Sequence, residues 1–247
     1  MKLDVLVFAA HPDDAELGCG GTIASLVKQG KKIGIVDLTR GEMGTRGTAE
    51  TRMLEAEKAS EILGLVYRNN LEIPDSYIQN TRENQLKVIQ EVRRYQPHIC
   101  FLGAPYDRHP DHGYATQMLL DALFYSGLRK IETKDENHAI QEPWRPKHIL
   151  HFMQDRSFEP DFIYDITGFL DTKIESVLAY SSQFNVTELG NEPATYISSS
   201  SFFKQIEARA RFYGHQGGCK LGEPFKYHHA PVQITDMEMF FKTEPNR

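Results

Sequence analysis

Short apolar runs alternate with longer amphipathic stretches along most of these 247 residues. The runs predict buried strands, and the amphipathic stretches between them predict helices. Strands that are joined by helical crossovers form parallel sheets, and the helices then cover both faces. We therefore expect an α/β fold that is Rossmann-like, with a mainly parallel sheet. A chain of this length with 40% hydrophobic residues can form one domain over residues 1–247.

The alternation gives approximate bounds for each element. The predicted strands are 3–10, 31–38, 98–102, 148–153 and 162–166, and the predicted helices are 20–30, 49–63, 81–95, 111–126, 168–183 and 199–213. We expect residues from about 214 to 247 to form a peripheral extension. The charged stretch 129–145 lacks clear periodicity and predicts a surface excursion or an oligomer contact.

Composition excludes several classes of partner. The formal net charge is −6 and there is no block of lysine or arginine, so neither nucleic acid nor an anionic membrane is expected as a partner. The first apolar run is too short for a signal core or a membrane span. Cys19, Cys100 and Cys219 are odd in number and form no CxxC pair, which is typical of free thiols in a reducing compartment. We expect a cytoplasmic protein that acts on a small molecule.

Two groups of potential metal-binding side chains each follow a predicted strand. His11-Pro12-Asp13-Asp14 follows the first strand, and His109-Pro110-Asp111-His112 follows the strand 98–102. In an open parallel sheet, ligands bind beyond the carboxyl ends of the strands, near the switch in strand order. We therefore expect both groups at one site. His11, Asp14 and His112 would hold one divalent ion and leave a position for water, as in catalytic zinc sites.

The remaining side chains of the two groups suggest catalytic roles. Asp13 lies beside the predicted ligands without being needed as one, so we assign it as the general base. His109 would stabilise a developing oxyanion, with Asp111 orienting it or holding it protonated. This set of residues is typical of a metal-assisted amide hydrolase.

The first group also carries a resemblance to a known family. The segment from Ala10 to Glu16, with Gly18 and Gly20-Gly21-Thr22, resembles the signature of the LmbE-like (PIG-L) N-acetylglucosaminyl deacetylases, and His109 to His112 is similar to that family's second motif. The resemblance covers nearly the whole chain. Weaker matches are Arg52-x-x-Glu55, Glu207-Ala208-Arg209-Ala210 and Gly222-Glu223-Pro224-Phe225. Leu221-Gly222 departs from the family, which more often has an aromatic residue and an alanine before the glutamate.

The resemblance implies a function. Within the family, the chain most resembles the bacillithiol-pathway enzymes that deacetylate N-acetylglucosaminyl malate. It implies zinc or iron(II) at His11, Asp14 and His112, a base at Asp13, oxyanion support from His109 and a sugar contact from Arg52. It also implies a homo-oligomer, often a hexamer. Deacetylation of N-acetylglucosamine or of chitooligosaccharides is the alternative within the family.

Two alternatives come from other classes. A dinucleotide-binding oxidoreductase also has a strand, a Gly-rich turn and a helix, but Ile23 stands where the third glycine or alanine is needed. A non-catalytic metal-binding or sugar-binding protein would usually surround its ion with protein ligands.

Several other residues receive weaker interpretations. Arg108 is a weaker substrate contact, Tyr196 is expected to be a buried aromatic, and Glu16 is expected to support the first loop. We expect His228 and His229 to be a solvated pair, since their spacing from His215 and Cys219 matches no zinc pattern.

Overall fold

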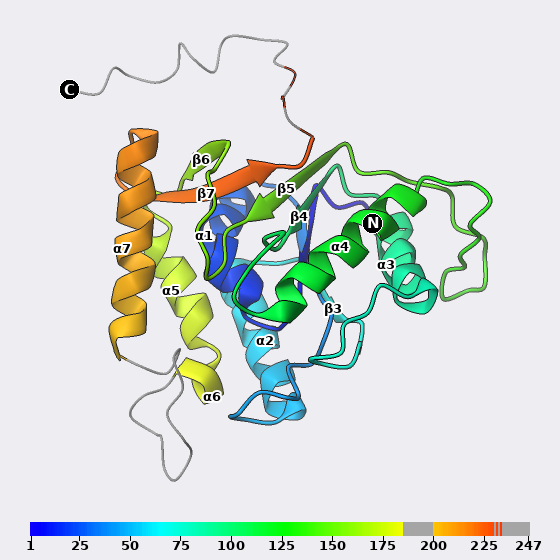
Figure 1. Cartoon of the computed structure of the whole chain (residues 1–247), viewed down its shortest axis with the longest axis horizontal. Coiled ribbons are helices and arrows are strands. Elements are labelled where there is room, and N and C mark those ends of the chain that lie inside the picture. The colour runs from blue at the N-terminus through cyan, green and yellow to red at the C-terminus, as the bar shows by residue number, and fades with distance from the viewer. Residues whose placement is uncertain (185–199, 230, 232, 234–247) are drawn as a thin grey trace.

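The computed structural model describes residues 1–184, 200–229, 231 and 233. Its strands form one sheet in the order β3-β2-β1-β4-β5-β7-β6 (Figure 1). The strands are β1 Val5–Ala9, β2 Ile33–Asp37, β3 Tyr67–Asn70, β4 Ile99–Leu102, β5 His148–Phe152, β6 Phe162–Asp165 and β7 Gly222–Tyr227. The helices are α1 Asp14–Lys28, α2 Ala49–Leu63, α3 Arg82–Tyr95, α4 Pro110–Tyr125, α5 Leu170–Leu178, α6 Ser181–Phe184 and α7 Ser200–Gly217.

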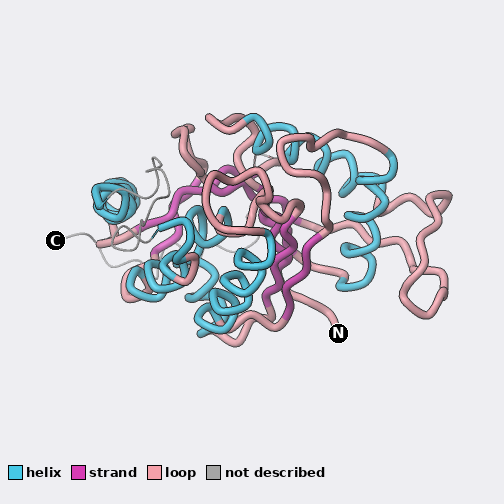
Figure 2. Tube along the Cα trace, turned by 90° about the horizontal axis from the view of Figure 1, so that it is seen from below, coloured by secondary structure: helices cyan, strands magenta, loops and turns pink. Residues whose placement is uncertain are grey.

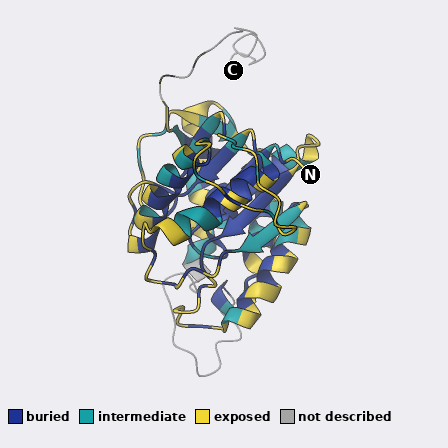
Figure 3. Cartoon of the chain, turned by 90° about the vertical axis from the view of Figure 1, so that its right-hand side faces the viewer, coloured by how far each residue is buried: buried dark blue, intermediate teal, exposed yellow. Residues whose placement is uncertain are grey.

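The side chains of β1 divide between two cores because successive residues of a strand point to opposite faces. Leu6 and Phe8 pack in one core, which α3 and α4 complete. Val5 and Val7 pack in the other, which includes Ile23 of α1. Helices lie on both sides of the strands in Figure 2, and the central strands are buried in Figure 3. The predicted α/β architecture is confirmed.

The strand order reverses beside β1. β1 pairs in parallel with β2 on one side and with β4 on the other, and β4 pairs in parallel with β5. The loops that follow β1 and β4 therefore leave the same edge of the sheet as neighbours. This is the position where ligands bind in open α/β sheets.

Two strands were missed by the sequence prediction. β3 has the sequence Tyr-Arg-Asn-Asn, which lacks the apolar pattern of a buried strand. β7 lies between β5 and β6 and is antiparallel to both, so the prediction of a peripheral extension is wrong for residues 222–227. Proline is rare inside a sheet, and Pro224 in the middle of β7 hid this strand from pattern reasoning.

Helix α1 contains a break that ties it to the last strand. Cys19 has non-helical dihedral angles within the helix, with φ −142° and ψ 20°. Beyond the break, the backbone N–H groups of Gly21 and Thr22 donate to the Glu223 carboxylate at 3.1 and 2.7 Å. Lys173 of α5 pairs with the same carboxylate. Glu223 therefore caps the second half of α1 from a strand about two hundred residues away.

The stretch 129–145 is a surface excursion at the side of α3 and α4 (Figure 1). It contains one antiparallel bridge, between Lys134 and Ile140. The buried guanidinium of Arg93, in α3, donates to the backbone carbonyls of Ser126, Leu128 and Ile131. These bonds anchor the beginning of the excursion to α3.

Candidate metal centre and active site

The turn between β1 and α1 presents two carboxylates to the edge of the sheet. Asp14 begins α1, and its carboxylate accepts a hydrogen bond from the backbone N–H of His11 at 2.9 Å. Asp13 has φ 111°, a left-handed conformation that costs free energy in a residue other than glycine. Such strain is found at functional sites, where the surrounding structure holds the residue in place.

The second group of residues lies at the start of α4. His109 is the N-cap residue, and Pro110 occupies the first helical position, where its missing N–H is not needed. The backbone N–H of Asp111 donates to Nδ1 of His109 at 3.3 Å. Nδ1 therefore acts as an acceptor, which leaves Nε2 as the ring nitrogen that can donate.

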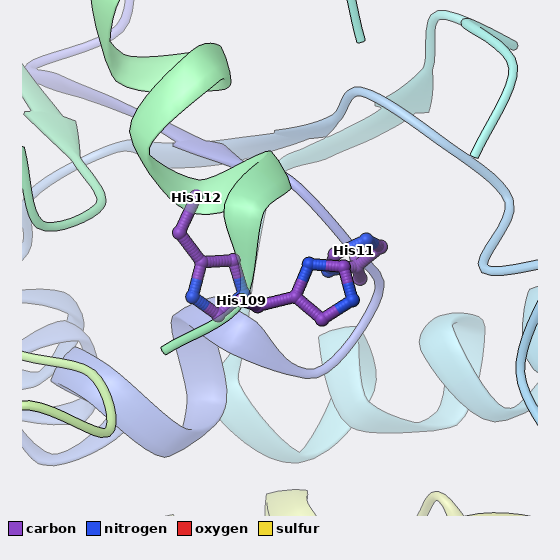
Figure 4. Close-up of side chains that lie close together, drawn as sticks. All are labelled: His11, His109 and His112. Carbon is purple, nitrogen blue, oxygen red and sulfur yellow. The ribbon is translucent and has the colours of Figure 1, made fainter. Parts of the chain in front are cut away.

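The two groups meet, as predicted. The His11 and His109 rings lie 4.8 Å apart between centroids, and His109 and His112 lie 5.2 Å apart (Figure 4). His11, His109 and His112 offer nitrogen atoms within 4.8 Å of one another, and His11, Asp75 and Asp111 form an overlapping group. These overlapping groups form a possible His/Asp metal site.

Asp14 lies between His11 and His112 at distances that suit a shared ion. Its Oδ2 lies 3.4 Å from Nδ1 of His11, and its Oδ1 lies 3.3 Å from Nε2 of His112. Donor atoms about 2.0–2.1 Å from a tetrahedral zinc ion are separated by about 3.3 Å. Imidazole nitrogens and carboxylate oxygens are donors that zinc takes, so the chemistry of the predicted donor set suits a divalent ion, and Asp14 lies beside both histidines.

Each of the two histidines turns its other ring nitrogen toward carboxylates. Nδ1 of His112 lies 2.6 Å from the carboxylate of Asp107. Nε2 of His11 lies 3.1 Å from Asp75 and 3.3 Å from Asp111. Carboxylates in this position orient metal-binding histidines and fix their tautomers. Neither Asp75 nor Asp107 was predicted from the sequence as a site residue.

The role predicted for Asp111 needs a correction. We expected its carboxylate to orient His109, but Oδ2 of Asp111 faces His11 and accepts from the backbone N–H of Ser76 at 2.8 Å. Because Asp111 occupies the first turn of α4, its side chain turns back toward the loop that carries Ser76. Its hydrogen bond to His109 is made through its backbone N–H. Asp111 does not hold His109 protonated, because burial and the neighbouring histidines lower the pKa of His109 overall.

Arg52 also differs from the prediction of a sugar contact. Its side chain is buried, and Nη2 of its guanidinium lies 3.2 Å from the carboxylate of Asp13 and donates to the carbonyl of Pro12. The guanidinium also lies over the Tyr180 ring, 5.8 Å from its centroid. These partners hold Arg52 behind Asp13, where it supports the strained turn.

The two neighbouring carboxyls of the turn have opposite proton affinities. Burial raises the pKa of Asp13 to about 7. Burial also acts to raise the pKa of Asp14, but His112 and His11 outweigh it and hold that pKa well below its usual range. Burial and the same two histidines lower the pKa of His109. Asp13 is thus suited to exchange protons near neutral pH, while Asp14 stays anionic.

A cavity of about 190 Å³ opens onto Asp13, Asp14, His109 and His112. Cationic and apolar side chains of the β4–α4 loop and α7 also line it, namely Arg108, Phe202, Ile206 and Arg209. Arg108 is largely exposed and pairs with Asp155 at 2.9 Å. The Arg209 guanidinium donates to the backbone carbonyls of Gln154 and Asp155. The cavity can hold a small molecule against the carboxyls of Asp13 and Asp14.

Other predicted residues have structural roles. Glu16 is buried and bonds to Arg68 and Tyr180, and Cys19 is a buried free thiol. His228 lies 3.2 Å from His151 between ring nitrogens. Within the described residues, the potential metal-binding clusters all include His11. His228 and His229 are both exposed. Tyr196 lies outside the described residues.

The geometry also argues against the oxidoreductase alternative. Gly18 and Gly20 lie inside α1 and not in the turn before it, where a pyrophosphate would need glycine. Two carboxylates occupy that turn instead, and they would repel a phosphate. Asp37, which imitates the ribose-binding acid, is buried and paired with Arg68 at 2.8 Å.

Comparison with known proteins identifies the family of this chain. Residues 6–123 match the family described as PIG-L, GlcNAc-PI de-N-acetylase. The conserved protein TT1542 from Thermus thermophilus, whose crystal structure is known, is 38% identical in sequence to this chain. The two structures match with a TM-score of 0.83 over 94% of this chain and 98% of that one. The match of residues 6–123 places the chain in the PIG-L family of deacetylases.

Two relatives with a named activity are similar over most of this chain. The diacetylchitobiose deacetylase of Thermococcus kodakarensis is 28% identical over 240 residues, which cover 90% of this chain and 82% of that one. The 4-oxalmesaconate hydratase of Pseudomonas putida is 26% identical over 204 residues, covering 74% of this chain and 75% of that one. Among the described helices, none is both long enough and apolar enough to cross a membrane.

Proposed function

We propose that the protein is a metal-dependent hydrolase that removes the acetyl group from N-acetylglucosaminyl malate in bacillithiol biosynthesis. The observation that carries the metal-dependent chemistry is the position of Asp14 between His11 and His112 at 3.4 and 3.3 Å, with Asp13 facing the same cavity. Zinc is the proposed ion, with iron(II) as the alternative in the cell, and His11, Asp14 and His112 would hold it. The ion would polarise the acetyl carbonyl and lower the pKa of a water molecule.

Side chains of the protein perform the remaining steps of the hydrolysis. Asp13 accepts a proton from the attacking water, since its raised pKa lies near the operating pH. His109 donates from Nε2 to the oxygen of the acetyl group as negative charge develops there. Asp13 then passes its proton to the departing nitrogen, which leaves acetate and a free glucosamine amine. Arg52 keeps the Asp13 carboxylate in its strained position.

Two arginines of the cavity lining support the choice of malate. Arg108 and Arg209 both line the cavity, and guanidinium groups bind carboxylates through paired hydrogen bonds. A malyl group carries two carboxylates, whereas a second N-acetylglucosamine is neutral. The alternative substrate is diacetylchitobiose, which is favoured by the similarity to the Thermococcus enzyme over most of both chains.

Acetate release separates these functions. We expect zinc-loaded protein to show a higher kcat/KM for N-acetylglucosaminyl malate than for diacetylchitobiose or N-acetylglucosamine. Asp13→Asn should lower kcat by about 10²–10⁴-fold while the ion stays bound. A preference for diacetylchitobiose would overturn the malate assignment. Stoichiometric zinc without acetate release from any of the three substrates would overturn the deacetylase proposal, and hydration of 4-oxalmesaconate by such a protein would replace it.

A further inference from the structure

Asp107 holds the far side of the His112 ring. Its Oδ2 lies 2.6 Å from Nδ1 of His112, and its Oδ1 accepts from the backbone N–H of Arg156 at 2.6 Å. The Asp107 side chain is fully buried and is not among those that line the cavity. Asp107 therefore cannot reach a substrate, and its contacts are with one histidine and with the backbone amides of Arg156 and Arg108.

The contact with Asp107 fixes which nitrogen of His112 carries a proton. A carboxylate accepts and cannot donate, so Nδ1 of His112 must be the donor in the 2.6 Å contact. A neutral ring with a proton on Nδ1 has its lone pair on Nε2. Nε2 is the atom that lies 3.3 Å from Asp14, on the side of the proposed ion.

We propose that Asp107 is a positioning residue that holds His112 in the tautomer and orientation required for metal binding, and that it thereby sets the affinity for the ion. This inference rests on the metal site of the proposed function. Removal of a carboxylate in this position typically lowers metal affinity by about 10–100-fold.

His11 does not depend on one carboxylate in the same way. Its Nε2 faces both Asp75 at 3.1 Å and Asp111 at 3.3 Å, so the loss of one leaves the other in place. His112 has the shorter contact, and the second oxygen of Asp107 is fixed by the Arg156 amide. We therefore expect Asp107 to matter more for metal affinity than Asp75.

Asparagine at position 107 creates a conflict that tests the inference. Arg156 N–H and His112 Nδ1–H both require an acceptor, and an amide side chain offers one oxygen in place of two. If the oxygen stays with Arg156, the amide nitrogen donates to Nδ1 and moves the ring proton to Nε2, where it blocks metal binding. If the amide turns over, the Arg156 N–H faces a donor.

The experiment measures zinc binding by metal-free protein in competition with a chromophoric chelator at one fixed pH. We expect Asp107→Asn to bind Zn²⁺ about 10–100-fold more weakly than wild type, and Asp75→Asn to lose less. Asp161→Asn is the matched control, because Asp161 also accepts a backbone N–H, that of Tyr227 at 2.7 Å, and contacts no histidine in the described structure. Asp161→Asn should keep wild-type affinity.

Each outcome has a distinct meaning. Wild-type zinc affinity in folded Asp107→Asn, or a larger loss in Asp75→Asn, would overturn the role of Asp107. A wild-type protein that binds no zinc would overturn the proposed function itself. If Asp107→Asn does not fold, ¹⁵N NMR of zinc-loaded wild-type protein decides instead. A proton on Nδ1 of His112 supports the inference, and zinc bound to Nδ1 overturns it.

Discussion

Replacement of Glu223 by glutamine tests how the last strand is joined to α1. The Glu223 carboxylate is almost fully buried and accepts from Gly21 N–H, from Thr22 N–H and from the Thr22 hydroxyl at 3.1, 2.7 and 2.6 Å. It is also paired with Lys173, whose side chain is 5% exposed. Glutamine has nearly the same shape, but it carries no charge and replaces one acceptor oxygen by a donor.

The expected loss of stability follows from these contacts. Breaking a buried ion pair by removing one partner costs about 3–5 kcal/mol, because the remaining charge is left without compensation. At about 2–4 °C per kcal/mol for a chain of this size, Glu223→Gln should lower Tm by roughly 6–20 °C. The double variant Glu223→Gln with Lys173→Met removes the uncompensated charge, so it should recover part of this loss.

Urea denaturation of wild type, both single variants and the double variant gives the coupling free energy between Glu223 and Lys173. We expect the double variant to be more stable than Glu223→Gln alone. A loss below about 1 kcal/mol in Glu223→Gln, or a double variant that is less stable than this single variant, would refute the assignment of a buried cap and ion pair.

Three further predictions concern packing, pH and the ion. Gly18→Ala should destabilise the fold by about 1–3 kcal/mol in urea, because its Cβ would lie 2.2 Å from the Phe152 ring; wild-type stability would contradict this packing. Burial lowers the pKa of His151 to about 4, below the unfolded value near 6.5. Its contribution to stability is therefore present above about pH 6.5 and lost as the pH falls toward 4, and His151→Gln should weaken this dependence in denaturation at a series of pH values. If the dependence of stability on pH were unchanged in His151→Gln, this would argue against a lowered pKa of His151. Removal of metal by a chelator should abolish acetate release, and added zinc should restore it; full activity in metal-free protein would exclude a metal-dependent reaction.

The fold was predictable where the sequence pattern follows burial. Strands such as Val5–Ala9 and Ile33–Asp37 are buried on both faces and appear as continuous apolar runs. β3 and β7 were missed because they carry charged residues that bind partners elsewhere in the chain. Arg68 of β3 pairs with Asp37 and Glu16, and Glu223 of β7 caps α1. Such contacts join positions far apart in the chain, so no local pattern indicates them.

The site was predictable to the extent that its residues cluster in sequence. His11 to Asp14 and His109 to His112 each follow a strand, and topology alone brings such loops together. The roles of Arg52 and Asp111 depend on side-chain direction, which spacing does not give. Asp107 had one local signal, since it follows β4 in the same loop as His109. Its contact with His112 becomes evident only when both ring nitrogens of that histidine are followed.

The position of β7 has a consequence for the order in which the chain folds. β6 is synthesised before β7, yet it joins the sheet only through β7, which lies between it and β5. Residues 162–165 therefore have no strand partner until residues 222–227 have been made. The parallel strands β1 to β5 can assemble earlier, because each pairs with a strand within that part of the chain. We therefore expect the Gly21 and Thr22 amides of α1 to exchange their protons rapidly in early intermediates and to become protected only when β7 is inserted.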